Sequence, residues 1–191
     1  ARMASSRFPG KPLHPIAGKP LLQHVFDRAS QWTDWDQLVI ATPDDEIRKF
    51  ALQIDAPFVM TDIRHVRGLD RVGEAARLTG FVKDSSDIVV NVQGDEPLLE
   101  VEMFRELCHP FEGDDSIHAT VLSMPVADEE EWLNPDTVKI IANDSGEVLY
   151  TSRSPVPFSE DGFTSELDAR KIFGLFAFPF PFPKINFFFF F

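Results

Sequence analysis

Short apolar runs alternate with stretches of helical periodicity along most of this chain. The runs typical of buried strands lie at 37–42, 57–61, 87–92 and 117–124. The helical stretches lie at 21–29, before the first run, and at 70–79 and 101–108, between later ones. Strands that alternate with helices usually pair in parallel, with helices on both faces of the sheet. The pattern therefore predicts an α/β fold built as a three-layer, mostly parallel sheet.

A different pattern begins at Thr137. The run T-V-K-I-I-A is followed by the turn residues N-D-S-G and by a second run, E-V-L-Y-T-S. Gly146 in the turn suits a left-handed backbone conformation, and Pro155 and Pro157 end the second run. We predict a small β-hairpin lobe over 137–157, within a single domain that spans 1–191.

The composition narrows the classes of partner. Acidic residues outnumber basic ones by 31 to 18, giving a formal net charge of −13. This balance argues against nucleic acid as a partner but allows a local basic pocket. The single cysteine, Cys108, excludes an internal disulfide framework, and its apolar neighbours predict a buried side chain rather than a nucleophile. No signal-peptide pattern is visible and no long uncharged apolar run precedes residue 171, so we expect a soluble cytoplasmic protein without a membrane partner.

The first thirteen residues are basic within this acidic chain. They contain Arg2, Arg7 and Lys11 and no acidic residue, and small residues such as Ser5 and Gly10 lie between the cations. Small residues let backbone N–H groups approach a ligand, and the cations add fixed positive charge. The segment is predicted to bind a polyphosphate; an exposed basic loop is the alternative that composition leaves open.

The apolar run 87–92 leads directly into Gln93-Gly94-Asp95-Glu96-Pro97. Carboxylates just past the carboxyl end of a central strand lie where open α/β sheets bind ligands. Asp95 and Glu96 are therefore candidate site residues, although polar turns between a strand and a helix are common.

Two ordered motifs resemble one enzyme family. The start, A-R-x-x-S-[ST]-R-[FL]-P-G-K-P-L, and the later N-V-Q-G-D-E-P are similar to signatures of the CMP-Kdo synthetase (3-deoxy-manno-octulosonate cytidylyltransferase) family. The resemblance implies a nucleotide-diphospho-sugar transferase-like fold. It also implies Mg²⁺-dependent transfer of CMP from CTP to the anomeric hydroxyl of a Kdo-like 3-deoxy sugar acid. The products would be pyrophosphate and a CMP-sugar for cell-surface polysaccharide synthesis.

The same resemblance implies residue roles. Arg2, Lys11 and Asp95 would be catalytic, with Asp95 as the Mg²⁺ ligand. Gln93 and Glu96 would contact the sugar acid. The residues that would bind the nucleotide phosphates are Arg2, Ser5, Arg7 and Lys11.

The segment 65–71, H-V-R-G-L-D-R, resembles the family's H-x-x-G-[TS]-[DE]-R. By this resemblance His65, Gly68, Asp70 and Arg71 would bind the nucleobase end of CTP. Gly68 would let the base lie close to the backbone, while Asp70 and Arg71 would fix the loop and the start of the helix. Leu69 departs from the pattern, because the family has a small hydroxyl residue there.

The segment 149–157 resembles the family's L-Y-F-S-R-x-x-I-P, which makes Ser152 and Arg153 candidate ligands of the sugar acid. Arginine matches a carboxylate with paired donors; an arginine that pairs with a neighbouring acid at a subunit interface is the alternative. The resemblance also implies a homodimer built through the hairpin lobe. The apolar residues expected to be exposed on that hairpin are Val138, Ile140, Ile141, Val148 and Leu149.

Both ends depart from the family pattern. The chain starts where the family has an apolar strand before the Ala-Arg, and it lacks the V-D-T-P-E-D-like stretch that carries a second metal-binding aspartate. The tail 173–191 is anomalous, since it holds ten of the 19 phenylalanines. Ile172, Phe176 and Phe178 stand where the family has a histidine and two tyrosines. We expect the natural sequence to carry histidine in place of Ile172 and tyrosine in place of Phe176 or Phe178, and to continue beyond 191.

Two alternatives remain open at this point. The sugar acid could be another nonulosonate, such as a sialic acid. The protein could also be a non-catalytic nucleotide-binding homologue, which would fit Leu69, the altered strand near 172 and the missing aspartate.

Overall fold

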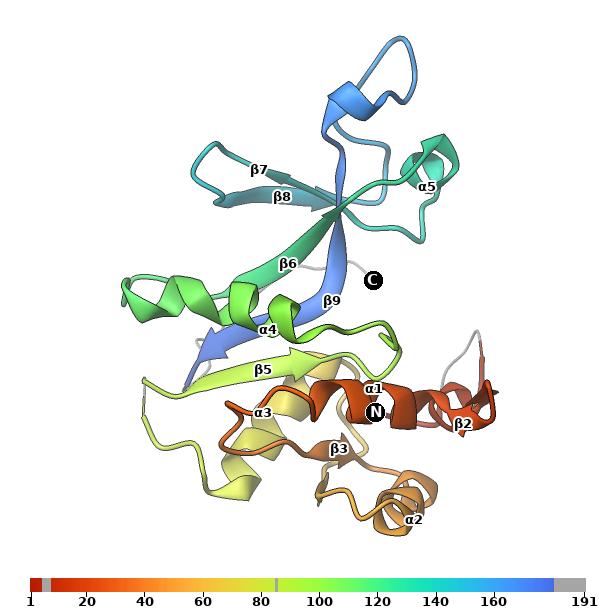
Figure 1. The fold of residues 1–191 in the computed structure, drawn as a ribbon, viewed down its shortest axis with the longest axis vertical. Coiled ribbons are helices and arrows are strands. Elements are labelled where there is room, and N and C mark those ends of the chain that lie inside the picture. Colours follow the sequence, from red (N-terminus) through yellow and green to blue (C-terminus); the bar gives the residue numbers. More distant parts are fainter. Residues whose placement is uncertain (5–7, 85, 181–191) are drawn as a thin grey trace. The chain divides into compact units, whose positions relative to one another are not determined.

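The computed structural model describes residues 1–4, 8–84 and 86–180 of the chain (Figure 1). The chain divides into two compact units. The first unit contains Ala1–Thr120 and the segment from Leu175 onward, and the second contains Val121–Gly174. No helix in the described ranges has the length and apolar character that a membrane crossing requires.

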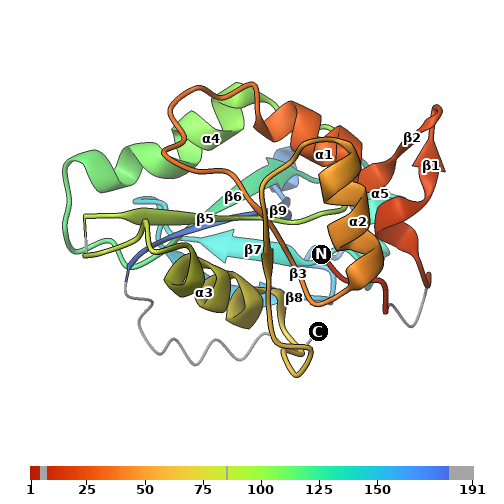
Figure 2. The ribbon, with the colours of Figure 1, turned by 90° about the horizontal axis from the view of Figure 1, so that it is seen from below.

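Helices cover both sides of a strand in the first unit. Its helices are α1 (Leu21–Ala29), α2 (Asp45–Gln53), α3 (Gly68–Thr79) and α4 (Val101–Cys108), with 3-10 turns at Lys11–Leu13 and His109–Glu112. Its strands are β1 (Pro15–Ile16), β2 (Lys19–Pro20), β3 (Ile40–Thr42), β4 (Phe58–Met60) and β5 (Ile88–Val92). Figure 2 shows α4 on one side of β5 and α3 on the other, which is the layering expected of an α/β protein.

The strand pairings define the class. β3 and β4 pair in parallel, with Ile40 opposite Phe58. β5 pairs antiparallel with the last residues of β9 (Arg170–Pro179), so that Val92 lies opposite Leu175. The predicted α/β class, with a parallel and an antiparallel part, is confirmed. The antiparallel run of β9 beside β5 joins residues far apart in sequence, and local periodicity does not indicate it.

One core of the first unit lies where α1 and α2 meet β3. Leu22, Ile40, Ile47 and Phe50 belong to this buried cluster. The predicted face of α1 is confirmed at Leu21, Leu22, Val25 and Ala29, and Phe26 is partly buried beside it.

An aromatic cluster packs against α4. Trp32 stacks on Phe104, with ring centroids 5.5 Å apart and an interplanar angle of 10°. Trp35 meets both rings close to edge-on. Phe104 is fully buried, so these rings complete the apolar side of the helix.

The second unit is built around a hairpin. Its elements are β6 (Thr120–Pro125), α5 (Glu129–Leu133), β7 (Lys139–Ala142), β8 (Val148–Ser152), a 3-10 turn at Ser165–Leu167 and the start of β9. β7 and β8 pair antiparallel, as Figure 1 shows, and the turn between them contains Gly146 at φ 84°. The predicted hairpin is thus confirmed. β9 pairs with both β6 and β7, and a small core of Val126, Trp132 and Ala169 lies beside them.

Several boundaries differ from the prediction. β3 begins at Ile40 rather than at 37, and β6 covers Thr120–Pro125 rather than 117–124. A residue joins a strand only where a neighbouring backbone pairs with it, and β4 pairs with β3 from Ile40 onward. The expectation that Ile140 is exposed is wrong: its side chain is 6% exposed.

The described part of the phenylalanine-rich tail is an ordered strand. Leu175, Phe176, Ala177 and Phe178 are all buried in β9. Phenylalanine is well suited to this position because large apolar side chains stabilise a strand that is covered. The rest of the tail, 181–191, lies outside the described residues, and the expected histidine and tyrosines stay predictions.

Candidate active site

The ion pair between Lys11 and Asp95 is the centre of the candidate site. The Lys11 Nζ and an Asp95 carboxylate oxygen lie 2.6 Å apart, and each side chain is about two-fifths exposed. Lys11 opens a 3-10 turn near the start of the chain, and Asp95 follows β5. The structure therefore brings together the two motifs that sequence analysis singled out.

Glycines let these two segments approach. Gly10 has a φ of 76°, and its N–H donates to the Met3 carbonyl, 3.0 Å away, which folds the basic segment back on itself. A Cβ on Gly94 would lie 3.4 Å from a Leu22 methyl group and 3.5 Å from the Ala1 Cβ. A Cβ there would be in van der Waals contact with both, so the turn that carries Asp95 passes close to the start of the chain.

Positive charge gathers around Arg2 and Arg71. Arg71 is 5% exposed, and burial lowers the pKa of its guanidinium; the nearby positive charge of Arg2 lowers it further. Asp44 partly offsets this, and it also accepts a hydrogen bond from the Met3 N–H at 2.7 Å. Arg2 itself is exposed. Two arginines close enough to repel each other favour an anionic ligand at this place.

Arg71 braces the loop that was predicted to hold the base. Its Nη1 donates to the Thr61 hydroxyl at 2.6 Å and to the Asp62 carbonyl at 3.2 Å. Its Nη2 donates to the His65 carbonyl at 3.2 Å. This geometry suits the loop-fixing role expected of Arg71. Gly68 begins α3, and a Cβ added there would meet open space.

Sequence analysis missed a partner of this loop, Glu74. Its carboxylate accepts the Asp62 N–H at 2.7 Å and lies 2.6 Å from the His65 Nε2. These contacts lower the pKa of Glu74, chiefly through the Asp62 N–H. Glu74 sits one helical turn beyond Arg71, and that spacing is the only signal that could have found it. Asp70 is exposed.

The turn after β5 also holds the predicted sugar-acid residues. Glu96 N–H donates to the Gln93 carbonyl at 3.3 Å, so Gln93, Asp95 and Glu96 lie in one tight turn. Among the described residues, no group of three or more His, Cys, Asp or Glu side chains could hold a metal ion by itself. Mg²⁺ commonly uses one or two protein carboxylates together with substrate phosphates, so Asp95 fits as a single protein ligand.

Ser152 and Arg153 belong to the second unit. The Arg153 Nη1 donates to the Pro135 carbonyl at 2.6 Å and lies 3.9 Å from an Asp136 carboxylate oxygen. The Ser152 hydroxyl accepts the Ser154 N–H at 3.0 Å. Arg153 thus has an acidic neighbour within its own unit. Two predicted phosphate ligands, Ser5 and Arg7, lie outside the described residues.

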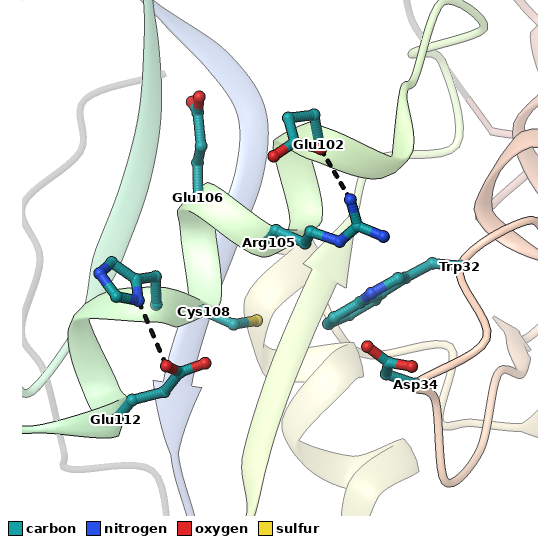
Figure 3. A pocket seen from close by; sticks show the side chains of 8 residues that line it. Trp32, Asp34, Glu102, Arg105, Glu106, Cys108 and Glu112 are labelled. Atoms are coloured by element: carbon teal, nitrogen blue, oxygen red, sulfur yellow. Dashed lines mark hydrogen bonds and ion pairs between the residues drawn. The ribbon is translucent and has the colours of Figure 1, made fainter.

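A surface cavity of about 450 Å³ lies beside α4, away from the predicted site residues (Figure 3). Figure 3 shows Trp32 and Asp34 facing side chains of α4, including Cys108. Burial raises the pKa of the Cys108 thiol to about 11, and the charge of Glu112 adds to this. A thiol with so high a pKa is a poor nucleophile, as predicted for Cys108, but the prediction that it is buried is wrong, because the residue is only partly buried beside this cavity.

An α/β unit in which cations and a carboxylate meet past a strand end is characteristic of nucleotide-binding transferases. The comparison with protein families makes this specific: the family model "Cytidylyltransferase" matches residues 1–177. The chain belongs to the cytidylyltransferase family, and the resemblance found in its motifs is confirmed.

The names of individual relatives are more specific than the name of the family. The chain is 44% identical over 162 residues to a 3-deoxy-manno-octulosonate cytidylyltransferase of Oleidesulfovibrio alaskensis. The aligned residues cover 85% of this chain and 64% of the relative. A protein of the same name from Nitratidesulfovibrio vulgaris is 42% identical, over 93% of the chain and 70% of the relative. The chain thus spans roughly two thirds of the length of these relatives.

A solved structure supports the same assignment. The structure of a CMP:2-keto-3-deoxy-manno-octonic acid synthetase complexed with CTP superposes with a TM-score of 0.81 at 32% sequence identity. The match covers 94% of this chain and 71% of the solved one.

Proposed function

We propose that this protein is a Mg²⁺-dependent cytidylyltransferase that transfers CMP from CTP to the anomeric hydroxyl of Kdo. Pyrophosphate is the second product, and the CMP-sugar serves cell-surface polysaccharide synthesis in the cytoplasm. The observation that carries the proposal is the meeting of Lys11 and Asp95 at 2.6 Å. The names of the relatives and of the solved CTP complex support it.

The cations of the first unit neutralise the triphosphate. Lys11 and Arg2 are positioned on the basic segment, and the buried Arg71 adds positive charge behind them. Charge-assisted hydrogen bonds from such groups are stronger than neutral ones and orient a phosphate. Arg7 is proposed as a further phosphate ligand.

Asp95 is the residue that would hold Mg²⁺, together with phosphate oxygens of CTP. A metal ion bound there stabilises negative charge that develops at the α-phosphate. Lys11 is within hydrogen-bond distance of the same carboxylate, so it can fix the orientation of Asp95 and then donate to a phosphate oxygen.

The sugar acid has two sets of proposed ligands. Gln93 and Glu96 belong to the turn after β5, and Ser152 and Arg153 lie where β8 ends. Arginine suits the carboxylate of the sugar acid because its N–H groups match two carboxylate oxygens. The protein is further proposed to act as a homodimer, through the exposed apolar side chains of β8.

The test is product formation with matched sugar acids. The purified protein is incubated with CTP, Mg²⁺ and either Kdo or N-acetylneuraminic acid, and the CMP-sugar is measured by mass spectrometry and pyrophosphate by a coupled assay. CMP-Kdo without CMP-sialic acid supports the proposal. The reverse preference would show the sialic-acid alternative. CTP binding without either product would show a nucleotide-binding homologue that is not catalytic.

A further inference from the structure

A buried ammonium lies at the base of the hairpin in the second unit. Lys139 on β7 is 0% exposed. Its Nζ donates to three backbone carbonyls: those of Asn134 at 2.8 Å, Thr137 at 2.8 Å and Arg153 at 3.0 Å. An ammonium carries three N–H donors. Each of them is therefore used on a backbone oxygen, which leaves none for a ligand.

Burial of a charge is costly, so the three hydrogen bonds must compensate for it. Burial lowers the pKa of Lys139, and the positive charge of Arg153 lowers it further. An apolar side chain could fill the same space without that cost. An apolar side chain could not, however, form the hydrogen bonds that join the turn 134–137, before β7, to residue 153, after β8.

Arg153 is held to the same turn a second time. Its Nη1 donates to the Pro135 carbonyl at 2.6 Å. Both parts of Arg153 are thus held to the turn 134–137. The Lys139 ammonium links its backbone carbonyl to the turn, and its guanidinium donates to the turn directly. The Arg153 side chain is still 37% exposed, and a guanidinium has five N–H donors, so it can also bind a ligand.

We infer that Lys139 is a positioning residue for Arg153. Its ammonium holds the turn 134–137 and the backbone of residue 153 in the arrangement that presents the Arg153 guanidinium to the carboxylate of the sugar acid. This inference rests on the function proposed above and adds to it a residue that touches neither substrate.

The kinetic test compares Lys139→Met with Lys49→Met, which removes an exposed lysine of α2. In Lys139→Met the KM for the sugar acid should rise about tenfold or more, as expected when one charge-assisted hydrogen bond is lost. The KM for CTP should stay within about twofold, because the nucleotide residues lie in the other unit. Lys139→Gln keeps two donors and should give a smaller rise. Circular dichroism establishes that each variant is folded.

A double-mutant cycle shows whether the effect passes through Arg153. In an Arg153→Ala background, Lys139→Met should raise the KM for the sugar acid no further. An unchanged KM in a folded Lys139→Met variant would overturn the inference, as would an equal rise in both backgrounds or an equal rise in the KM for CTP. Should Lys139→Met fail to fold, Lys139→Gln takes its place in the same cycle.

Hydrogen exchange separates failure of this inference from failure of the proposed function. The amides of Asp136, Thr137 and Ser154 are hydrogen-bonded inside the two joined segments. In Lys139→Gln they should exchange faster, while the amides of 65–71 keep their wild-type rates. Wild-type protein that makes no CMP-sugar would refute the proposed function, whereas unchanged exchange at these three amides would refute the positioning role of Lys139.

Discussion

The Lys11 ammonium and the Asp95 carboxylate lie 2.6 Å apart although 84 residues separate them in the chain. Each comes from a different motif, one basic and close to the start, the other after a central strand. Their contact joins the group proposed to bind phosphate to the group proposed to hold the metal, which is the pairing that nucleotidyl transfer requires. A second pair of similar exposure, Lys19 and Asp27, lies 2.8 Å apart elsewhere in the first unit and serves as a matched control.

Asp95→Asn should abolish turnover while CTP binding survives. A metal at the α-phosphate acts mainly on charge that develops in the transition state, so the rate suffers more than the affinity. Steady-state assays with Mg²⁺ measure the first quantity and calorimetry with CTP the second. Asp27→Asn, from the control pair, should keep wild-type turnover. Full activity of Asp95→Asn would reject the metal assignment.

Arg7→Ala should weaken CTP binding by roughly 1–3 kcal/mol, the range for hydrogen bonds to charged groups. Isothermal calorimetry at constant salt measures the change. Arg77→Ala removes an exposed arginine near the end of α3 and serves as the control for net charge. Equal affinities of Arg7→Ala and wild type would show that the basic segment does not bind the triphosphate.

Arg71→Met should lower the free energy of unfolding by about 1.5–3 kcal/mol, because the Thr61 hydroxyl and the Asp62 and His65 carbonyls lose their charged donor. Urea denaturation followed by circular dichroism gives the value. Arg77→Met should cost far less. A fully stable Arg71→Met variant would mean that the loop 65–71 is braced by other contacts.

Cys108 should react slowly with iodoacetamide in the native protein. Its pKa is raised from 9.0 to about 11, so the thiolate fraction at pH 8 is about 100-fold lower than in the unfolded chain. The folded state therefore keeps the proton at higher pH. The contribution of the protonated Cys108 thiol to the free energy of unfolding is complete below about pH 9 and is lost as the pH rises through 11. Alkylation followed by mass spectrometry tests this, and rapid native alkylation at pH 8 would contradict it.

Leu149→Lys should convert the proposed homodimer to a monomer. Val148, Leu149 and Tyr150 of β8 are 47%, 61% and 51% exposed, and a two-fold axis at this strand would cover the same side chains on both subunits. Light scattering at micromolar concentration measures the mass. Leu52→Lys, at a similarly exposed leucine of α2, should leave the mass unchanged. A wild-type protein that is already monomeric would refute the dimer.

The sequence was most informative where local chemistry decides the structure. The stripe of Val101, Phe104 and Leu107 predicted a helix over 101–108, and α4 has those bounds because one apolar face suffices to define it. The turn at Gly146 was predictable for a similar reason, since few other residues accept its positive φ.

Contacts between residues far apart in the chain could not be predicted from the sequence. No local pattern shows that Lys139 will be buried, since lysine in a hairpin strand usually faces water. Its three acceptors are backbone oxygens brought together only by the fold. The Glu74 contacts with His65 and the Asp62 N–H have the same character. The motifs therefore supplied the candidate site residues, which stay predictions, whereas the contacts of Lys139 and Glu74 became visible only in the structure.

The aromatic packing described for the fold offers a spectroscopic use. The chain has three tryptophans. Trp32 and Trp35 lie against Phe104 in the first unit, whereas Trp132, 5% exposed, lies in the small core of the second. A Trp132→Phe variant would therefore emit from the first unit alone, and the double variant of Trp32 and Trp35 to Phe from the second alone. Each unit thus contains its own intrinsic fluorophore, so its melting can be followed separately without any added label.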